Sequence, residues 1–259
     1  MIGTPKKTFE ILKKHGFTFK KSLGQNFLID ANILNRIVDG AGVNGNVGVI
    51  EIGPGIGSLT EALAKKAKKV ISFEIDGRLL PILSETLADY PNVEIINNDI
   101  LKVDVDNIIA EKMSDCEKIM VVANLPYYIT TPILTHLIEN TEKIDGYVVM
   151  MQKEVANRLN AKVGTKDYNS LTILLNYYTD VEYLFTVPKK VFVPAPNVES
   201  AVVKIMTKET REFETDAKFF KFVRSCFVQR RKTLLNNLIS SYGKDKKQDL
   251  QNACVDSDI

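Results

Sequence analysis

Short apolar runs alternate with segments of helical spacing through the first 150 residues. The runs at 47–52, 69–76, 93–100, 119–123 and 146–151 predict strands, several of them apolar on both faces. Helical spacing is clearest at 30–39, where Ile33, Leu34, Ile37 and Val38 recur on one side. Strands that alternate with helices predict an α/β fold around a parallel sheet.

Polar or flexible residues stand where four of these strands end, namely Gly53, Glu74, Asp99 and Asn124. Helical crossovers between parallel strands are right-handed, so the carboxyl ends of the strands meet at one edge of the sheet. Ligands of open α/β sheets bind at that edge. We therefore expect the four positions to line one pocket.

The first strand runs into a glycine turn, Gly-Pro-Gly-Ile-Gly at 53–57, and Ser58 with Glu61 predicts a capping box for a helix ending near Ala67. The turn has G-x-G-x-G spacing rather than the G-x-G-x-x-G that seats a pyrophosphate, so alone it is a weak signal. Glu74 follows Gly53 by 21 positions, where a carboxylate could bind both hydroxyls of a ribose. An ordinary solvated glutamate is an equally good interpretation.

The stretch from Asn124 to Tyr127 combines an amide, a proline-fixed bend and an aromatic ring. It precedes a helix for which we predict Thr131 as N-cap and Pro132 at the first position. The stretch offers hydrogen-bond acceptors and a stacking surface, but no nucleophile, metal ligand or strong base.

Further along, helices are predicted at 153–161 and 170–178, and an antiparallel strand pair at 181–187 and 200–206 at the sheet edge. The connecting loop carries Phe192 beside prolines. Residues 209–216 are polar and predict a boundary, so we expect domains at 1–207 and 208–259. A single basic helix is predicted at 217–241, and no acidic residue occurs from 217 to 244, which favours phosphate contact.

Composition excludes several classes of function. The chain has 259 residues and a net charge of +2, with three scattered cysteines and two histidines, which leaves little material for a metal cluster or a disulfide framework. No apolar run approaches the roughly 18 residues that a membrane span needs. The first 14 residues lack the features of a secretory or transit signal, and we expect a cytoplasmic protein without a membrane partner.

The motifs together resemble the rRNA adenine N6-dimethyltransferases, and most closely the KsgA-type members, which act on small-subunit rRNA. The matching segments, in family order, are Leu-Gly-Gln-Asn-Phe-Leu at 23–28, Glu-Ile-Gly-Pro-Gly-Ile-Gly at 51–57, Asn-Leu-Pro-Tyr at 124–127, Gln-Lys-Glu-Val-Ala at 152–156, Phe-Val-Pro-Ala-Pro-Asn-Val at 192–198 with Ser200, and Cys-Phe-Val-Gln-Arg-Arg-Lys-Thr-Leu at 226–234.

This resemblance implies a class I, Rossmann-like methyltransferase fold with a small C-terminal helical domain. It implies S-adenosylmethionine as cofactor, S-adenosylhomocysteine as product and no metal. Members dimethylate two adjacent adenosines near the 3′ end of small-subunit rRNA during ribosome assembly, so the expected partner is that rRNA, bound by a monomer.

The resemblance also implies roles for particular residues. Catalysis and base stacking are expected at Asn124, Leu125, Pro126, Tyr127 and Phe192. Cofactor contacts are expected at Asn26, Leu28, Gly53, Gly55, Glu74, Ile75, Asp99, Ile100 and Asn124. Contacts to rRNA are expected at Lys20, Lys21, Arg224, Arg230, Arg231 and Lys232.

Three other interpretations stay open from the sequence. A large-subunit rRNA methyltransferase of the antibiotic-resistance type shares the Asn-Leu-Pro-Tyr motif, and a catalytically idle assembly or transcription factor could share the fold. An NAD-dependent enzyme is disfavoured by the glycine spacing. The chain departs from the family after Ile259, where relatives continue with further helical residues, which leaves the rRNA contacts of the small domain open.

Overall fold

The computed structural model describes residues 1–208 and 213–258, without the side chains of Lys21 and residues 213–216. The chain divides into two compact units. The first holds Met1–Asn157 and Thr179–Thr207, and the second holds Arg158–Tyr178 and Lys208–Ile259.

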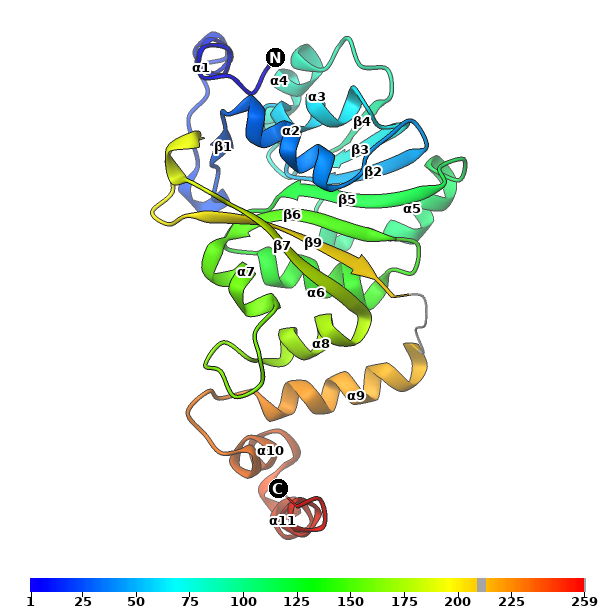
Figure 1. The fold of residues 1–259 in the computed structure, drawn as a ribbon, viewed down its shortest axis with the longest axis vertical. Helices are drawn as coiled ribbons and strands as arrows, with labels where there is room; N and C mark the ends of the chain where they lie inside the picture. The colour runs from blue at the N-terminus through cyan, green and yellow to red at the C-terminus, as the bar shows by residue number, and fades with distance from the viewer. Residues whose placement is uncertain (209–212, 259) are drawn as a thin grey trace. The chain divides into compact units, whose positions relative to one another are not determined.

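The helices are α1 (Pro5–Lys14), α2 (Ala31–Gly40), α3 (Ser58–Ala64), α4 (Leu80–Thr86), α5 (Val105–Lys112), α6 (Thr130–Asn140), α7 (Lys153–Leu159), α8 (Ser170–Tyr178), α9 (Phe213–Cys226), α10 (Leu234–Tyr242) and α11 (Lys247–Asp256). The strands are β1 (Phe27–Leu28), β2 (Val47–Ile52), β3 (Lys69–Phe73), β4 (Val93–Ile96), β5 (Lys118–Asn124), β6 (Gly146–Gln152), β7 (Thr179–Val187), β8 (Phe192–Val193) and β9 (Ser200–Thr207). Figure 1 labels most of them.

The first unit is built on a sheet in which the described strands follow the order β4-β3-β2-β5-β6-β9-β7. The first five pair in parallel, and β9 and β7 add an antiparallel edge. This arrangement confirms the predicted α/β class and the predicted edge pair. Strands β1 and β8 form a separate antiparallel pair, in which Leu28 lies opposite Phe192.

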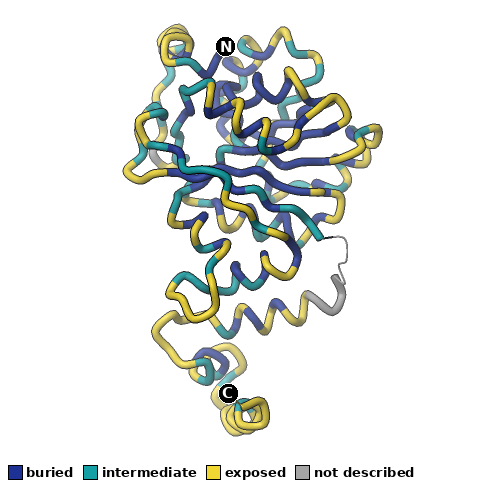
Figure 2. The backbone as a smooth tube through the Cα atoms, in the orientation of Figure 1, coloured by how far each residue is buried: buried dark blue, intermediate teal, exposed yellow. Residues whose placement is uncertain are grey.

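The centre of the sheet is buried on both faces, as its apolar strands require. Strand β2 is buried along its whole length, and β5 is buried from Ile119 to Ala123. Helices α2 and α3 cover one face through a core cluster that includes Leu34, Ile37 and Leu63. Figure 2 shows the strands as the dark blue centre of this unit, with exposed loops at the ends of the strands.

The predicted capping box at the start of α3 is wrong. Gly57 is the N-cap, with a left-handed φ of +90°, and no side chain caps the helix. The Glu61 carboxylate instead accepts hydrogen bonds from the Ile2 N–H, at 2.5 Å, and from Lys65 Nζ, at 2.8 Å. Ser58 therefore stands inside the first turn, and the helix ends at Ala64 rather than near Ala67.

Helix α6 also begins earlier than predicted. Its N-cap is Ile129 and its first residue is Thr130, so Thr131 is not the cap and Pro132 occupies the third helical position. The Thr130 hydroxyl donates to the Pro126 carbonyl at 3.0 Å. This bond joins the turn after β5 to the helix that follows it.

The second unit is helical and built on aromatic contacts. The rings of Tyr178 in α8 and Phe220 in α9 lie 5.2 Å apart between centroids, and those of Tyr177 and Phe219 lie 5.7 Å apart. Because these rings join α8 to α9, residues 158–178 group with the C-terminal unit, whereas the predicted boundary placed all of 1–207 in one domain. Of the polar stretch predicted as a boundary, residues 209–212 lie outside the described chain.

The single helix predicted at 217–241 is interrupted. Helix α9 ends at Cys226 and α10 begins at Leu234, with Thr233 as its N-cap. The buried Asn237 explains the break, because its amide donates to the carbonyls of Cys226, at 3.0 Å, and Gln229, at 3.2 Å. Its oxygen accepts from the Gln229 N–H at 2.8 Å. A polar side chain thus satisfies backbone groups that a continuous helix would pair internally.

Candidate active site

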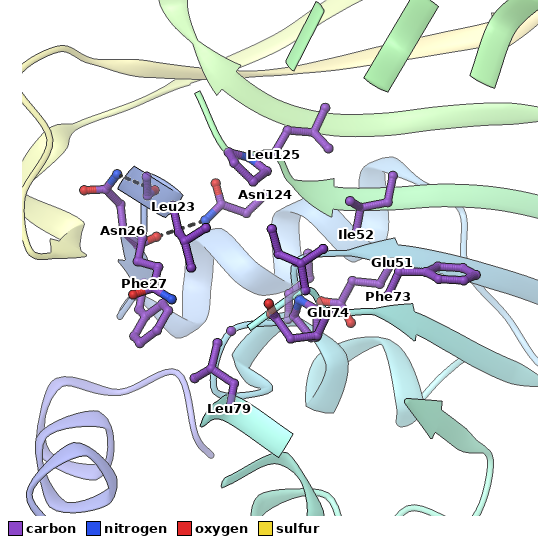
Figure 3. A pocket seen from close by; sticks show the side chains of 18 of the residues that line it. Leu23, Asn26, Phe27, Glu51, Ile52, Phe73, Glu74, Leu79, Asn124 and Leu125 are labelled. Carbon is purple, nitrogen blue, oxygen red and sulfur yellow. Dashed lines mark hydrogen bonds between the residues drawn. The ribbon is translucent and has the colours of Figure 1, made fainter. Parts of the chain in front are cut away.

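A pocket in the first unit opens where β2, β3 and β5 end. Its lining includes all four residues predicted at the strand ends, Gly53, Glu74, Asp99 and Asn124. The wall facing them is formed by residues 23–28. Figure 3 shows side chains from the strand ends and from this opposite wall converging on the same space.

The glycine turn gives the pocket a backbone wall. Gly53 and Gly55 both have left-handed φ values, +69° and +60°. A Cβ on Gly55 would stand 2.9 Å from the Phe27 ring, whereas a Cβ on Gly53 would meet nothing closer than Pro126 at 3.9 Å. Gly53 is thus fixed by conformation, and Gly55 by both conformation and space.

Glu74 follows β3 and is 5% exposed. Its Oε1 accepts the Asp76 N–H at 2.8 Å, and the Gly55 N–H also bonds its carboxyl group. Burial raises the pKa of Glu74 above its ordinary value. A carboxylate in this position, beside a glycine backbone, suits the paired hydroxyls of a ribose.

The second carboxylate of the pocket belongs to Asp99, which is accompanied in the lining by apolar side chains. Asp99 lines the pocket and caps a short 3-10 turn, accepting the Leu101 N–H at 3.1 Å through Oδ1. Ile75 is 50% exposed, and the buried Ile100 follows Asp99 in the lining. Apolar faces with one acceptor at the edge suit a flat heterocycle that carries an amino group.

Asn124 is oriented by the opposite wall of the pocket. Its Nδ2 donates to the Asn26 carbonyl at 3.1 Å, which leaves Oδ1 as the acceptor of this amide (Figure 3). The Leu125 N–H donates to the Met150 carbonyl at 3.0 Å. Among the described residues, no hydrogen bond uses the Leu125 carbonyl, whereas the Pro126 carbonyl accepts from Thr130 and Ile129. Two acceptors thus stand beside one another at the end of β5.

Of the two aromatic residues expected to stack on a base, only Tyr127 lines the pocket. Its hydroxyl lies 2.5 Å from Ser200 Oγ, and burial raises its pKa. Phe192 is 2% exposed and belongs to the core cluster beneath β1, so it presents no free face to a base. Phe192 thus lies outside the pocket lining in this structure, and the stacking of both rings on a base stays a prediction.

Among the pocket residues without a predicted role, two stand out for their chemistry. Tyr128 is 53% exposed and lines the pocket, and its ring lies so close to Gly24 that a Cβ there would stand 3.2 Å from it. Glu51 is 1% exposed and also lines the pocket. Both residues had a signal in the sequence: Tyr128 directly follows Tyr127 in the turn, and Glu51 is a charged residue within an apolar strand.

The Glu51 carboxyl is held by hydroxyl groups. Its Oε2 accepts from Thr60 Oγ1 at 2.6 Å and from Ser72 Oγ at 2.8 Å, and neither bond uses Oε1. Burial raises its pKa from 4.5 to about 7 against these stabilising bonds. The group can therefore exchange a proton near neutral pH and could pair with a cationic ligand group.

We expect Glu51→Gln to stabilise the ligand-free protein at alkaline pH. The protonated carboxyl contributes stability that is fully present below pH 4.5 and is lost as pH rises through about 7. The difference between these values corresponds to about 3 kcal/mol, which the neutral amide would not lose. Urea unfolding of both proteins at several pH values from 4.5 to 8.5 would test this. A constant difference between the two proteins across that range would show that Glu51 titrates normally.

The residues expected to bind rRNA belong to both units. Lys20 is exposed on the segment that precedes the pocket wall, and the side chain of Lys21 lies outside the described structure. Arg224, Arg230, Arg231 and Lys232 are exposed in the second unit. Arg230 donates to the Lys166 carbonyl at 3.0 Å, which joins the connection between α9 and α10 to the loop before α8.

Two features are absent from the part of the chain that the structure describes. No group of three or more His, Cys, Asp or Glu side chains is arranged to hold a metal ion there. No helix in the described ranges has the length and apolar character of a membrane span.

The sequence profile described as "Ribosomal RNA adenine dimethylase" matches residues 16–258. The chain is 57% identical to a Bacillus pumilus protein named "Ribosomal RNA small subunit methyltransferase A", over 100% of this chain and 90% of that one. It is 58% identical to the Staphylococcus haemolyticus protein of the same name, over 95% and 84% of the two chains.

Two solved structures share the fold. A dimethyladenosine transferase from Plasmodium falciparum superimposes with a TM-score of 0.69 at 32% identity, covering 81% of this chain and 74% of that one. The 23S rRNA methyltransferase ErmE gives a TM-score of 0.64 at 27% identity, covering 85% and 86%. The fold is that of the Rossmann-like methyltransferases.

Proposed function

The chain belongs to the ribosomal RNA adenine dimethylase family, and we propose that it methylates small-subunit rRNA. The reaction transfers methyl groups from S-adenosylmethionine to the N6 amines of two adjacent adenosines near the 3′ end of that rRNA, during ribosome assembly. Identity of 57–58% to small-subunit enzymes, against 27% to the 23S enzyme, favours this substrate over large-subunit rRNA.

The lining of the pocket supports S-adenosylmethionine as the cofactor. Glu74 would accept from the two ribose hydroxyls, and Asp99 would accept from the adenine amino group, with Ile75 and Ile100 beside the ring. Gly53 and Gly55 provide a wall without side chains, and Asn26 and Leu28 lie opposite. The cofactor supplies a methyl group on a positively charged sulfur, which makes that methyl electrophilic.

The oriented amide of Asn124 is the observation that carries the proposal. An adenine N6 amine is a weak nucleophile, because its lone pair is delocalised into the ring. Asn124 Oδ1 and the Leu125 carbonyl would accept its two N–H bonds and favour a tetrahedral nitrogen whose lone pair is free. Pro126 limits the backbone, so the carbonyl direction is fixed. These acceptors bind the developing positive charge more strongly than the neutral amine.

The target adenine has to leave its stack to reach the pocket. Tyr127 lines the pocket and would stack on the extruded base, and stacking of this kind is worth about 1–3 kcal/mol per base. Tyr128, exposed at the same turn, is a second ring within the pocket lining. A stacking role for Phe192 would require a conformation other than the buried one.

Contact with rRNA would come from Lys20 and Lys21 and from the basic residues of the second unit, Arg224, Arg230, Arg231 and Lys232. Exposed cations near phosphates release counterions and give salt-dependent affinity. We propose that the protein acts as a monomer in the cytoplasm and needs no metal. An idle factor of the same fold is disfavoured because Glu74, Asp99 and Asn124 all line one pocket.

The test is methyl transfer to purified ribosomal subunits that lack these methyl groups. We expect the protein with S-adenosylmethionine to modify small subunits, and primer extension to stop at two adjacent adenosines near the 3′ end. Large subunits serve as the control for the antibiotic-resistance type. Modification of large subunits alone would overturn the proposal, and no transfer to either subunit would favour the idle factor.

A further inference from the structure

The pocket wall formed by residues 23–28 belongs to a longer segment, residues 17–28, which we name the N-terminal strap. Its last two residues form β1, pairing with Val193 and Phe192 of β8. Asn26 accepts the hydrogen bond from Asn124. These contacts anchor the C-terminal end of the strap near the turn at 124–127. The earlier residues of the strap are held by other contacts.

The middle of the strap is bound by Asp76, two residues after Glu74. Gln25 Nε2 donates to Asp76 Oδ2 at 2.8 Å, and Gln25 Oε1 accepts the Lys20 N–H at 2.9 Å. The Gln25 amide therefore has a defined orientation, with one end on the strap and the other on the turn after β3. Hydrogen bonds to a carboxylate are stronger than those between neutral groups.

Arg78 extends the same connection to the start of the strap. Its Nε donates to Asp76 Oδ1 at 2.9 Å, and its second terminal nitrogen pairs with Oδ2 at 2.5 Å. The remaining nitrogen donates to the Thr18 carbonyl at 3.1 Å. The guanidinium also lies 5.0 Å from the centre of the Phe17 ring. One arginine thus links a carboxylate to the backbone and an aromatic ring of the strap.

Asp76 bonds both the strap and Glu74, the residue proposed to bind the ligand. Its side chain is 4% exposed, and its own N–H donates to Glu74 Oε1 at 2.8 Å. The turn that holds the strap is therefore the turn that positions the carboxylate proposed to bind ribose. We name Gln25, Asp76 and Arg78 the strap clasp.

We propose that the strap clasp consists of positioning residues, which hold the N-terminal strap against the pocket and so set the affinity for the cofactor. The ligand's identity rests on the proposed function. The clasp residues act through the strap rather than on the reacting atoms. Release of the clasp should leave β1 paired while residues 17–25 loosen, because β1 has its own bonds to β8.

The first test is calorimetric binding of S-adenosylhomocysteine to the full chain. We expect Gln25→Ala to weaken binding about tenfold, the size expected for loss of a hydrogen bond to a charged group. The Michaelis constant for S-adenosylmethionine should rise more than the turnover number falls. Hydrogen exchange should speed up at the amides of residues 17–25 even without ligand. Asn46→Ala is the matched control, since Asn46 Nδ2 donates to Glu117 at 2.9 Å in an amide–carboxylate pair that is not part of the pocket.

A reciprocal exchange separates positioning from general destabilisation. Gln25→Glu alone should weaken binding, because it sets two carboxylates against each other. When Gln25→Glu is combined with Asp76→Asn, an amide–carboxylate pair again forms beside Arg78. The affinity of the double variant should recover to within about threefold of the parent, because the effects of residues in contact are not additive. Additive losses in the double variant would overturn the clasp.

Cofactor binding by the parent protein and the effect of the clasp on that binding can be tested separately. If the parent protein binds neither S-adenosylhomocysteine nor S-adenosylmethionine, the proposed function fails, and the role of the clasp in cofactor affinity fails with it. If the parent binds and Gln25→Ala binds equally well, only the clasp is overturned. The melting temperature of each variant shows whether a loss of affinity reflects unfolding.

Discussion

Asn124→Ala is expected to lower methyl transfer to small subunits by about 100-fold or more, while the cofactor still binds. Removal of one positioned hydrogen-bond group from a transition state typically has an effect of that size. The Asn26 carbonyl accepts a hydrogen bond from the Asn124 amide nitrogen, and this orientation leaves the Asn124 oxygen to accept from the substrate amine. With alanine, the amine keeps only the Leu125 carbonyl, and its lone pair stays delocalised for longer along the reaction.

The measurement is a single-turnover rate at saturating S-adenosylmethionine, paired with calorimetric binding of S-adenosylhomocysteine. Asn140→Ala is a suitable control, because among the described residues this exposed amide at the end of α6 bonds only the His136 side chain and carbonyl of its own helix. Asn124→Asp should also be slow, since a carboxylate has no hydrogen to donate to the Asn26 carbonyl. Near-parental turnover of Asn124→Ala would remove Asn124 from catalysis.

The sheet and the pocket edge were predictable from the sequence because both depend on periodicity. Apolar runs separated by helical segments determine a parallel order, and parallel order brings strand ends together. Gly53, Glu74, Asp99 and Asn124 could therefore be assigned to one pocket before any coordinates, and the pocket lining confirms this.

Contacts between distant side chains were not predictable in the same way. Periodicity across residues 217–241 indicated one helix, and the break depends on Asn237 bonding backbone groups eight and eleven residues earlier. Ser58 and Glu61 fit a capping motif, but Glu61 accepts from the N–H of Ile2, which lies 59 residues earlier in the chain. Phe192 fits a family motif, yet its pairing partner Leu28 carries it into the core. A local pattern does not specify which remote group competes for a side chain.

The same limit applies to the electrostatics of the site. Glu51 is the second-to-last residue of β2 and Glu74 directly follows β3, so both glutamates stand beside apolar strand residues in the sequence. In the structure, Glu51 bonds two hydroxyl groups and its pKa rises to about 7, whereas Glu74 bonds backbone N–H groups that oppose the effect of burial. The charge on Glu74 also contributes to the rise in the pKa of Glu51. A ligand that pairs with Glu74 therefore changes the titration of Glu51.

Glu74→Ala is expected to weaken cofactor binding by at least about 100-fold, because two charge-assisted hydrogen bonds to the ribose are lost and each is worth about 1.5–3 kcal/mol. The Michaelis constant for S-adenosylmethionine should rise, with a smaller change in turnover at saturation. Calorimetry at pH 8.5 gives a cleaner comparison than neutral pH, since alkaline pH favours the ionised form of both Glu51 and Glu74. In the parent, affinity should fall as pH drops through the raised pKa of Glu74, because only the carboxylate accepts from both hydroxyls.

Glu74→Gln distinguishes the ribose contact from the structural bond that the same side chain makes. The glutamine keeps one oxygen to accept the Asp76 N–H, so the turn that holds the strap should survive, but it has no second acceptor and no charge. We expect its affinity to fall between those of the parent and Glu74→Ala, with strap amides exchanging at the parental rate. If Glu74→Ala binds S-adenosylhomocysteine as tightly as the parent at pH 8.5, Glu74 does not bind the ribose. If Glu74→Gln instead binds like the parent, the bond to Asp76 rather than the negative charge accounts for the loss in Glu74→Ala.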